Sequence, residues 1–318
     1  MNFHGKDIKI FSANSNRQLA KQIAEALGLP LGKSEVTTFS DGEIAVSINE
    51  SVRGSDVFVV QSTCKPVNDH LMELLIMIDA FKRASAARIT AVIPYMGYAR
   101  QDRKAKARDP ISAKLVADLI TTAGADRVLT MDLHANQIQG FFDIPVDNLL
   151  GSPVFVEHFL RRFAAVHEDT MVVSPDVGSV ARARAFAQKL DMPMAIVDKR
   201  RQKANSSEVM NIIGDVRDKH VILLDDMVDT GGSLCHAAKA LVDIGGAKDV
   251  TACASHGVLS GPAIKRITDS VLDEVIFLDT IPKRTTECNK LKYLSVAHMF
   301  AEAISHIYME TSVSPLFL

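Results

Sequence analysis

The sequence predicts an α/β protein of two similar domains, each built on a mostly parallel sheet flanked by helices. Short apolar runs typical of buried strands alternate with segments of helical periodicity along the whole chain, as parallel sheets covered on both faces require. The length of 318 residues exceeds what one hydrophobic core usually supports. A hydrophobic content of 47% with 23% charged residues is typical of a soluble globular protein.

The first half of the chain alternates strands and helices as far as a turn-rich stretch near residue 150. Strands are expected at 9–11, two or three times within 36–63, at 88–94 and at 127–132. Helices are expected at 19–27, after Asn68 or Asp69, and from Ser112 to Gly124. In the first of them, Leu19, Ile23 and Leu27 share one face, and Asn14 or Ser15 can cap its start.

The second half repeats this alternation. We expect helices from Pro153, at 180–190, after residue 233, shortly after 257 and at 296–309, and strands at 171–176, 195–199, 221–224, 249–257 and 274–280. A hairpin-like piece is expected at 211–220. The turn residues of IPVDNLLGSP mark a change of composition. We therefore predict an N-terminal domain at 1–149 and a C-terminal domain at 150–318.

Composition and charge exclude several classes of function. Thirty-six basic residues against 38 acidic residues give no overall attraction to nucleic acid or to an anionic membrane. The four cysteines are scattered without disulfide or metal-binding spacing, which indicates reduced thiols and a cytoplasmic protein. The first residues lack the apolar core of a signal peptide. Glu73 and Asp79 interrupt the longest apolar stretch, so no membrane span is expected.

The stretch VILLDDMVDTGGS, at 221–233, carries the most specific chemical pattern. A buried strand runs into Asp225 and Asp226, and then into a loop with two glycines just before a helix. A glycine loop at a helix N-terminus presents backbone N–H groups to a phosphate. Carboxylates accept hydrogen bonds, so the two acids suit the hydroxyls of a ribose. The stretch therefore predicts a ribose-phosphate site. It resembles the phosphoribosyl-diphosphate binding motif shared by phosphoribosyltransferases and ribose-phosphate pyrophosphokinases.

Two further side chains are expected at the carboxyl ends of strands, where open parallel sheets bind ligands. His134 follows the strand at 127–132, and Asp176 ends the strand at 171–176. Mg²⁺ prefers oxygen ligands, so the chemistry of His134 by itself indicates a structural hydrogen bond as strongly as it indicates metal binding. Asp176 is the better ligand, although it is equally suited to capping the helix that follows.

Two basic segments also follow predicted strands. In YARQDRK, Arg100 and Gln101 begin a basic loop that could bind a polyphosphate, and Gln101 could contact the edge of a base. A dense run of basic residues is, however, more often a solvent-exposed face. In DKRRQKANSSE, the basic residues Lys199, Arg200, Arg201 and Lys203 precede small polar residues, as in a mobile lid that stabilises charge on transferring phosphoryl oxygens. The alternative is a basic loop that is merely disordered. FSDGE, from Phe39, is by itself a weak signal for which a hairpin turn is the default interpretation.

Taken together, these segments resemble class I ribose-phosphate pyrophosphokinases, also called phosphoribosyl-diphosphate synthetases. The resemblance covers nearly the whole chain through FSDGE, VRGSDVF, QSTCKPVND, IPYMGYARQDRK, DLHANQIQGFFDIPVDNL, VVSPDVG, DKRR and LLDDMVDTGGS. It implies two phosphoribosyltransferase-like domains and a Mg²⁺-dependent enzyme. The implied reaction moves the β,γ-diphosphoryl group of ATP to the C1 hydroxyl of ribose 5-phosphate and releases AMP. The product would feed purine, pyrimidine, NAD, histidine and tryptophan synthesis.

The resemblance also implies a role for each matching residue. Lys199 and Arg201 would be the catalytic cations, with Arg201 also contacting ribose 5-phosphate. Asp225 and Asp226 would bind the ribose. The 5-phosphate would be bound by Asp229, Thr230, Gly231, Gly232 and Ser233. Ser233 stands where the family often has Thr. ATP would contact Phe39, Asp41, Gly42, Glu43, Arg100 and Gln101, the FSDGE residues reaching a neighbouring subunit's site. Magnesium would be held by His134 and Asp176.

Oligomeric state and regulation follow from the resemblance alone. It implies a homohexamer that needs phosphate and is inhibited by ADP, with Arg53, Arg83, Ser312 and Ser314 as candidates for a phosphate-holding regulatory site. There are two rival hypotheses. A phosphoribosyltransferase would explain the stretch at 221–233 but not a preceding domain with YARQDRK and FSDGE. A non-catalytic subunit of the synthetase would be expected to carry disrupted motifs, whereas these are intact.

Overall fold

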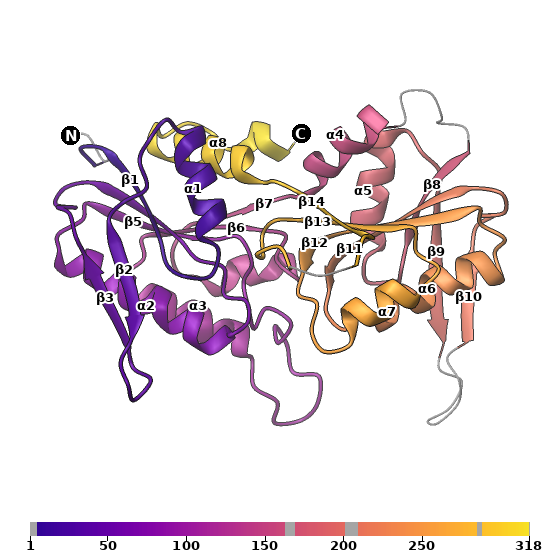
Figure 1. The fold of residues 1–318 in the computed structure, drawn as a ribbon, viewed down its shortest axis with the longest axis horizontal. Coiled ribbons are helices and arrows are strands. Elements are labelled where there is room, and N and C mark those ends of the chain that lie inside the picture. The colour runs from indigo at the N-terminus through magenta and orange to yellow at the C-terminus, as the bar shows by residue number, and fades with distance from the viewer. Residues whose placement is uncertain (1–4, 163–168, 201–208, 285–287, 318) are drawn as a thin grey trace. The chain divides into compact units, whose positions relative to one another are not determined.

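A computed structural model describes residues 5–162, 169–200, 209–284 and 288–317, with the side chains of 199, 200 and 209 left out. The chain forms two compact units (Figure 1). Unit 1 comprises Met1–Leu150, Thr280–Pro282 and Ser295–Leu318, and unit 2 comprises Gly151–Asp279 and Lys283–Leu294. Both units have the predicted α/β architecture of a mostly parallel sheet flanked by helices.

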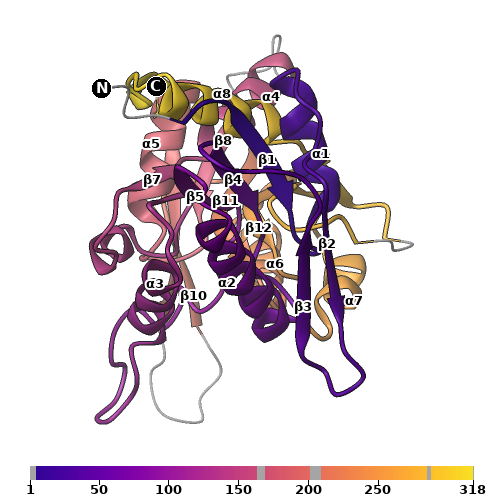
Figure 2. The ribbon, with the colours of Figure 1, turned by 90° about the vertical axis from the view of Figure 1, so that its left-hand side faces the viewer.

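Unit 1 is built on a five-stranded parallel sheet in the order β1-β4-β5-β6-β7. Its strands are β1 (Ile8–Ser12), β4 (Asp56–Val60), β5 (Arg88–Ile93), β6 (Arg127–Met131) and β7 (Val146–Leu149). Helices α1 (Arg17–Ala26) and α8 (Ala297–Tyr308) cover one face, and α2 (Val67–Arg83) and α3 (Ser112–Ala123) cover the other (Figures 1 and 2). Short 3₁₀ turns follow β6 and α8, at Asn136–Phe141 (η1) and Ser314–Phe317 (η2).

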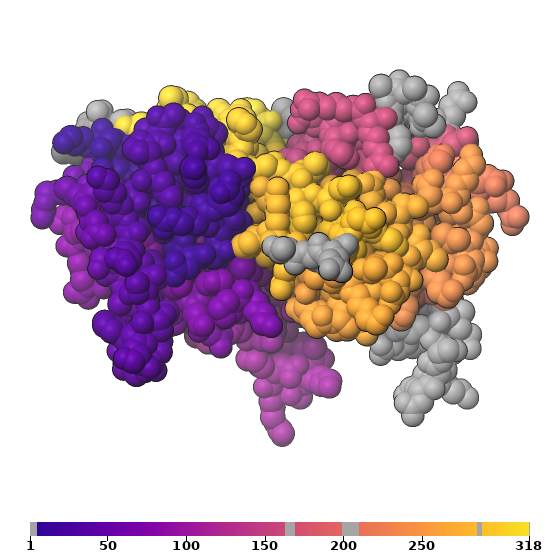
Figure 3. All heavy atoms as spheres, viewed as in Figure 1, coloured from indigo at the N-terminus to yellow at the C-terminus, as the bar shows by residue number. Residues whose placement is uncertain are grey.

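A separate two-stranded ribbon extends from unit 1. Strands β2 (Ser34–Thr38) and β3 (Ile44–Ile48) pair with each other in antiparallel register and form a sheet of their own. The ribbon projects from the body of the unit, as does the long loop between β5 and α3 (Figures 1 and 3). The FSDGE residues therefore form a hairpin turn.

The starts of two helices differ from the expected positions. The cap of α1 is Asn16, whose side chain accepts a hydrogen bond from the Leu19 N–H at 3.3 Å, so the assignment to Asn14 or Ser15 was wrong by one or two residues. Helix α2 starts at Val67, with Pro66 as its N-cap residue, one or two residues before the expected start at Asn68 or Asp69. The end of α3 at Gly124, which adopts φ +118°, is confirmed.

Unit 2 contains a seven-stranded sheet in the order β10-β9-β8-β11-β12-β13-β14. The strands are β8 (Thr170–Ser174), β9 (Met194–Arg200), β10 (Val209–Ile213), β11 (His220–Val228), β12 (Asp249–Gly257), β13 (Glu274–Leu278) and β14 (Leu291–Leu294). All neighbours are parallel except β9 and β10. Helices α4 (Ser152–Arg162) and α5 (Val180–Leu190) cover one face, and α6 (Gly232–Asp243) and α7 (Ala263–Asp269) cover the other (Figure 1).

Three features of the sheets were not expected from the sequence. β7 lies inside the turn-rich stretch that was interpreted as a domain boundary, and β14 had no counterpart among the predicted strands. β10 pairs with β9 and not with the strand that follows it. β11 continues beyond Leu224 to Val228, so that Asp225 and Asp226 belong to the strand itself.

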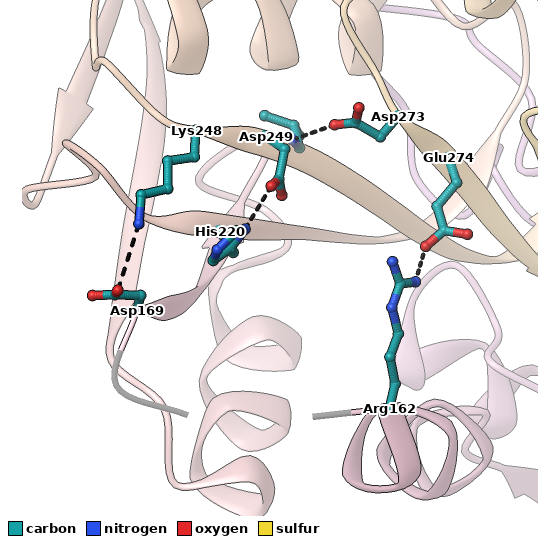
Figure 4. A network of polar contacts seen from close by, with 8 residues as sticks. Arg162, Asp169, His220, Lys248, Asp249, Asp273 and Glu274 are labelled. Atoms are coloured by element: carbon teal, nitrogen blue, oxygen red, sulfur yellow. Dashed lines mark hydrogen bonds and ion pairs between the residues drawn. The ribbon is translucent and has the colours of Figure 1, made fainter. Parts of the chain in front are cut away.

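Polar contacts and ion pairs occupy the amino ends of the unit 2 strands (Figure 4). His220 and Asp249 are the first residues of β11 and β12, and the His220 Nδ1 atom lies 2.5 Å from Asp249 Oδ2. Lys248 contacts Asp169 at 3.5 Å, and Arg162 pairs with Glu274. Such partly exposed pairs contribute at most about 1 kcal/mol each. At this edge of the sheet, these side chains find their partners within the chain. The predicted ligand-binding acids lie at the opposite edge, at the carboxyl ends of the strands.

Two expectations from composition can be compared with the structure. All four cysteines are free, and three of them are buried while Cys235 is half-buried. Within the residues that the structure describes, no helix combines the length and the apolar character needed to cross a bilayer.

Candidate functional site

The carboxyl end of β11 brings two adjacent acids to one edge of the unit 2 sheet. The strand is central, between β8 and β12, and its first half is an apolar run in which Leu223 is fully buried. Asp225 and Asp226 are neighbours at the end of this strand, and their side chains interact with each other. Asp226 is only 8% exposed. The sheet therefore holds two carboxylates where they lose much of their hydration.

The environment of Asp225 favours its protonated form. Burial raises the pKa of Asp225 to about 7, and the neighbouring charges of Asp226 and, more weakly, Asp176 add to the shift. One carboxylate oxygen is held by the Ser179 hydroxyl at 3.0 Å and by the Asp226 backbone N–H at 2.9 Å. The side chain is thus fixed in place, and its surroundings disfavour its negative charge. Groups perturbed in this way are often found at functional sites.

Asp176 lies in the turn between β8 and α5. Its Oδ1 accepts a hydrogen bond from the Ser179 N–H at 3.0 Å, and its carbonyl accepts one from Ser174 at 2.7 Å. Ser179, not Asp176, is the N-cap residue of α5. Ser179 therefore contacts both Asp176 and Asp225. Sequence reasoning missed Ser179, and its place directly after the SPDVG motif is the only signal that could have indicated it.

The loop from Asp229 to Ser233, here called the phosphate loop, leads directly into α6. Gly231 is the N-cap residue and adopts φ +74°, a conformation that a side chain would strain. Its carbonyl accepts the N–H of Cys235 at 3.0 Å, which closes the first turn of the helix. The N–H groups of the first helical residues have no partner inside the helix and carry its partial positive charge. All five residues predicted to bind the 5-phosphate are thus brought together.

The predicted ATP residues belong to unit 1. In the hairpin, the Phe39 N–H donates to the Glu43 carbonyl at 2.8 Å, and the Glu43 N–H donates to Asp41 Oδ1 at 3.1 Å. Gly42 adopts φ +98°, and the Phe39 ring is 59% exposed. The turn is rigidly built, yet its aromatic side chain is left at the surface.

The other unit 1 residues lie in connections that leave the sheet. Arg100 and Gln101 are both exposed. The Gln101 carbonyl accepts the N–H of Ala113 at 3.2 Å, and its side-chain oxygen accepts the Ser112 hydroxyl, so that Gln101 anchors the start of α3. His134 is exposed just after β6.

The remaining predicted residues are only partly described. Arg201 lies outside the described residues, and Lys199 is placed in β9 through its backbone alone. His134 belongs to unit 1 and Asp176 to unit 2. Within the described ranges, His, Cys, Asp and Glu side chains do not gather in threes that could hold a metal ion. A Mg²⁺ ion with one or two carboxylates, water and substrate oxygens does fit the donor set of unit 2.

Unit 2 thus carries a chemically coherent set of groups. Two carboxylates at a strand end accept hydrogen bonds from a diol, and the adjoining loop and helix terminus attract a phosphate. The two parts are separated by only two residues of chain, Met227 and Val228. They suit a single ligand with hydroxyls and a phosphate, such as a sugar phosphate.

Known proteins match this chain over its full length. A ribose-phosphate pyrophosphokinase of Clostridium perfringens is 65% identical over 318 residues, covering 100% of this chain and 99% of that protein. This chain belongs to the ribose-phosphate pyrophosphokinase family. A ribose-phosphate pyrophosphokinase of Thermotoga maritima is 59% identical over 311 residues, covering 98% of each protein. The family's N-terminal domain matches residues 8–124, and the phosphoribosyl synthetase-associated domain matches residues 201–318.

A solved structure of the family supports the same assignment. The crystal structure of phosphoribosylpyrophosphate synthetase from Mycobacterium smegmatis aligns with a TM-score of 0.88 and 44% identity, covering 96% of this chain and 100% of that one. The predicted resemblance to ribose-phosphate pyrophosphokinases is therefore confirmed. So is the predicted fold class of two phosphoribosyltransferase-like domains. The roles assigned to single residues stay predictions.

Proposed function

We propose that this chain transfers the β,γ-diphosphoryl group of ATP to the C1 hydroxyl of ribose 5-phosphate, forming 5-phosphoribosyl 1-diphosphate and AMP. The observation that carries the proposal is the carboxylate pair of β11 followed by the phosphate loop, in a chain 65% identical to a ribose-phosphate pyrophosphokinase. Asp225 and Asp226 would hold the ribose hydroxyls, and Asp229–Ser233 the 5-phosphate. Fixing the sugar at both ends orients its C1 hydroxyl for in-line attack.

The other predicted roles complete this proposal. Phe39, Asp41, Gly42, Glu43, Arg100 and Gln101 would bind ATP, and Lys199 and Arg201 would stabilise charge on the transferring group. The exposure of the Phe39 ring supports a role at another surface, such as a neighbouring subunit of a homohexamer. Phosphate and ADP would act as effectors, with Arg53, Arg83, Ser312 and Ser314 as candidate contacts. A cytoplasmic location suits the free cysteines.

The carboxylates of unit 2 would hold Mg²⁺ together with water and substrate oxygens. Asp176 and the carboxylates of β11 supply hard oxygen donors of the kind that Mg²⁺ prefers. His134 and Asp176 stay the predicted protein ligands. The ion would neutralise charge on the diphosphoryl oxygens. The residues of this chain would hold the ribose, orient its C1 hydroxyl and exclude water.

The direct test is to incubate the pure protein with ATP, Mg²⁺, inorganic phosphate and ribose 5-phosphate and to follow the nucleotides by ³¹P NMR. We expect AMP and a new diphosphate ester in equal amounts. Formation of ADP in place of AMP would contradict the proposal, as would the absence of turnover at any phosphate concentration. Release of diphosphate from phosphoribosyl diphosphate and a free base, without ATP, would indicate a phosphoribosyltransferase.

The catalytic assignment of Lys199 has a test of its own. Replacing Lys199 by Ala should lower kcat by about two orders of magnitude or more, because a cation that meets only the transferring group acts mainly in the transition state. The binding of ribose 5-phosphate, measured by calorimetry without ATP, should change less than threefold (roughly 0.6 kcal/mol). Loss of sugar-phosphate binding with preserved kcat would show that Lys199 holds the substrate and takes no part in catalysis.

A further inference from the structure

One segment of unit 2, residues 259–266, is hydrogen-bonded to the backbone of the phosphate loop. This segment leads from β12 into α7. The Leu259 N–H donates to the Val228 carbonyl at 3.0 Å, and the Ser260 N–H donates to the Asp229 carbonyl at 2.9 Å. The guanidinium of Arg266 donates from Nη1 to the Thr230 carbonyl at 3.1 Å. This segment therefore holds three consecutive carbonyls, that of Val228 at the end of β11 and those of Asp229 and Thr230 in the loop, and the third is held by a side chain.

These bonds decide where the N–H groups of the loop point. In a trans peptide, the C=O and the next N–H point in opposite directions across one rigid plane. Because the carbonyls of Val228, Asp229 and Thr230 face the 259–266 segment, the N–H groups of the three residues that follow them face the other way. A row of N–H groups turned to one side forms an anion-binding concavity. The bond from Arg266 fixes the last of these planes, whose N–H belongs to Gly231.

The charge of Arg266 is also placed unusually. Its Nη1 lies 3.3 Å from where a Cβ on Gly232, the first residue of α6, would be. A helix N-terminus carries a partial positive charge, so a cation beside it is unfavourable. Asp269 on the same helix pairs with Lys265 at 2.6 Å, and Arg266 has no ion-pair partner among the described residues. A bound phosphate would supply the missing negative charge.

We propose that Arg266 is a positioning residue for the sugar phosphate: it fixes the Thr230–Gly231 peptide plane toward the anion and adds positive charge at the start of α6. This inference rests on the proposed function, because it assumes that the phosphate loop holds the 5-phosphate. Arg266 acts through the loop backbone. Gly231 also packs against the segment, since a Cβ there would lie 3.5 Å from the Ala263 carbonyl oxygen. The segment and the loop thus form one rigid support.

The test compares Arg266→Met and Arg266→Lys with Lys265→Met, which removes a neighbouring exposed cation from the same helix. Losing one charge-assisted hydrogen bond should raise the KM for ribose 5-phosphate about 5- to 50-fold in Arg266→Met. The KM for ATP and the kcat at saturating sugar phosphate should stay within about twofold, because only the binding of the sugar phosphate is affected. Arg266→Lys, which keeps a cation and donors, should recover part of the loss, and Lys265→Met should match the wild type.

Each other outcome has a defined meaning. An unchanged KM for ribose 5-phosphate in Arg266→Met, in a wild type that turns over, would overturn the positioning role and leave the proposed function standing. A parallel rise in both KM values with a lower Tm would also overturn it, because it would show general destabilisation. If Arg266→Lys were as defective as Arg266→Met, the contribution of charge would be refuted. A wild type that does not convert ribose 5-phosphate would instead overturn the proposed function.

Discussion

At the scale of single residues, Asp225 shows how burial prepares a side chain for a ligand. Its pKa of about 7 lies far above the ordinary 3.8 because the strand end desolvates it and places Asp226 beside it. Between these two pH values the folded protein keeps a proton that the unfolded chain releases, so stability falls as pH rises through this window. Above about pH 7 the folded protein carries the whole cost of the buried charge.

Replacing Asp225 by Asn should therefore stabilise the ligand-free protein at pH 8 and do so much less near pH 4. The gain can reach a few kcal/mol, since each pKa unit corresponds to about 1.4 kcal/mol. The measurement is thermal unfolding in the presence of a chelator at both pH values. The same variant should raise the KM for ribose 5-phosphate, because an amide accepts hydrogen bonds less well than a carboxylate. The exposed acid Asp243 serves as the control, and a lower Tm for Asp225→Asn at pH 8 would refute the argument.

At the scale of elements, the start of α6 shows why the phosphate loop needs glycine. Gly231 adopts φ +74° and is buried against the segment that precedes α7. Gly28, at the end of α1, adopts a similar φ of +68° but has open space around it. The two residues have a similar positive φ, and only one of them belongs to the predicted site. They form a matched pair.

Gly231→Ala and Gly28→Ala should each lower stability, because an L-residue in this conformation costs about 1–2 kcal/mol. Only Gly231→Ala should also raise the KM for ribose 5-phosphate, by about tenfold or more. The added side chain would change the backbone conformation of the loop, so that its N–H groups would no longer converge on one point. Steady-state kinetics and thermal unfolding of both variants provide the measurement. Equal KM values in the two variants would show that the loop does not bind the sugar phosphate through this geometry.

At the scale of the whole chain, the C-terminal helix belongs to unit 1 although it follows unit 2 in sequence. The predicted division at residue 150 would place this helix in the second domain, whereas α8 lies beside α1 (Figures 1 and 2). Phe300 and Ile304 of α8 are fully buried. An apolar helix face must be covered by some neighbour, but its periodicity does not identify which one. Unit 1 therefore depends on residues nearly 300 positions from its first strand.

Ile304→Ala should destabilise the protein by about 2–5 kcal/mol, the usual cost of such a truncation in a core. Hydrogen exchange followed by mass spectrometry should show the loss of protection first in α1 and α8. Glu302→Ala, at an exposed position of the same helix, is the control and should leave exchange unchanged. A loss of protection centred on α4 to α7 would mean that α8 supports unit 2.

The sequence alone determined the α/β class, nearly all of the strands and helices, and the strand–loop–helix motif with its two acids. These are local properties, because the period of apolar residues and the glycine pair are read from neighbours in the chain. Only the tertiary structure decided that Ser179 holds Asp225, that Arg266 holds the phosphate loop, and that α8 packs on α1. Each of these contacts joins residues far apart in sequence, and their selection depends on which surfaces the completed sheets bring together.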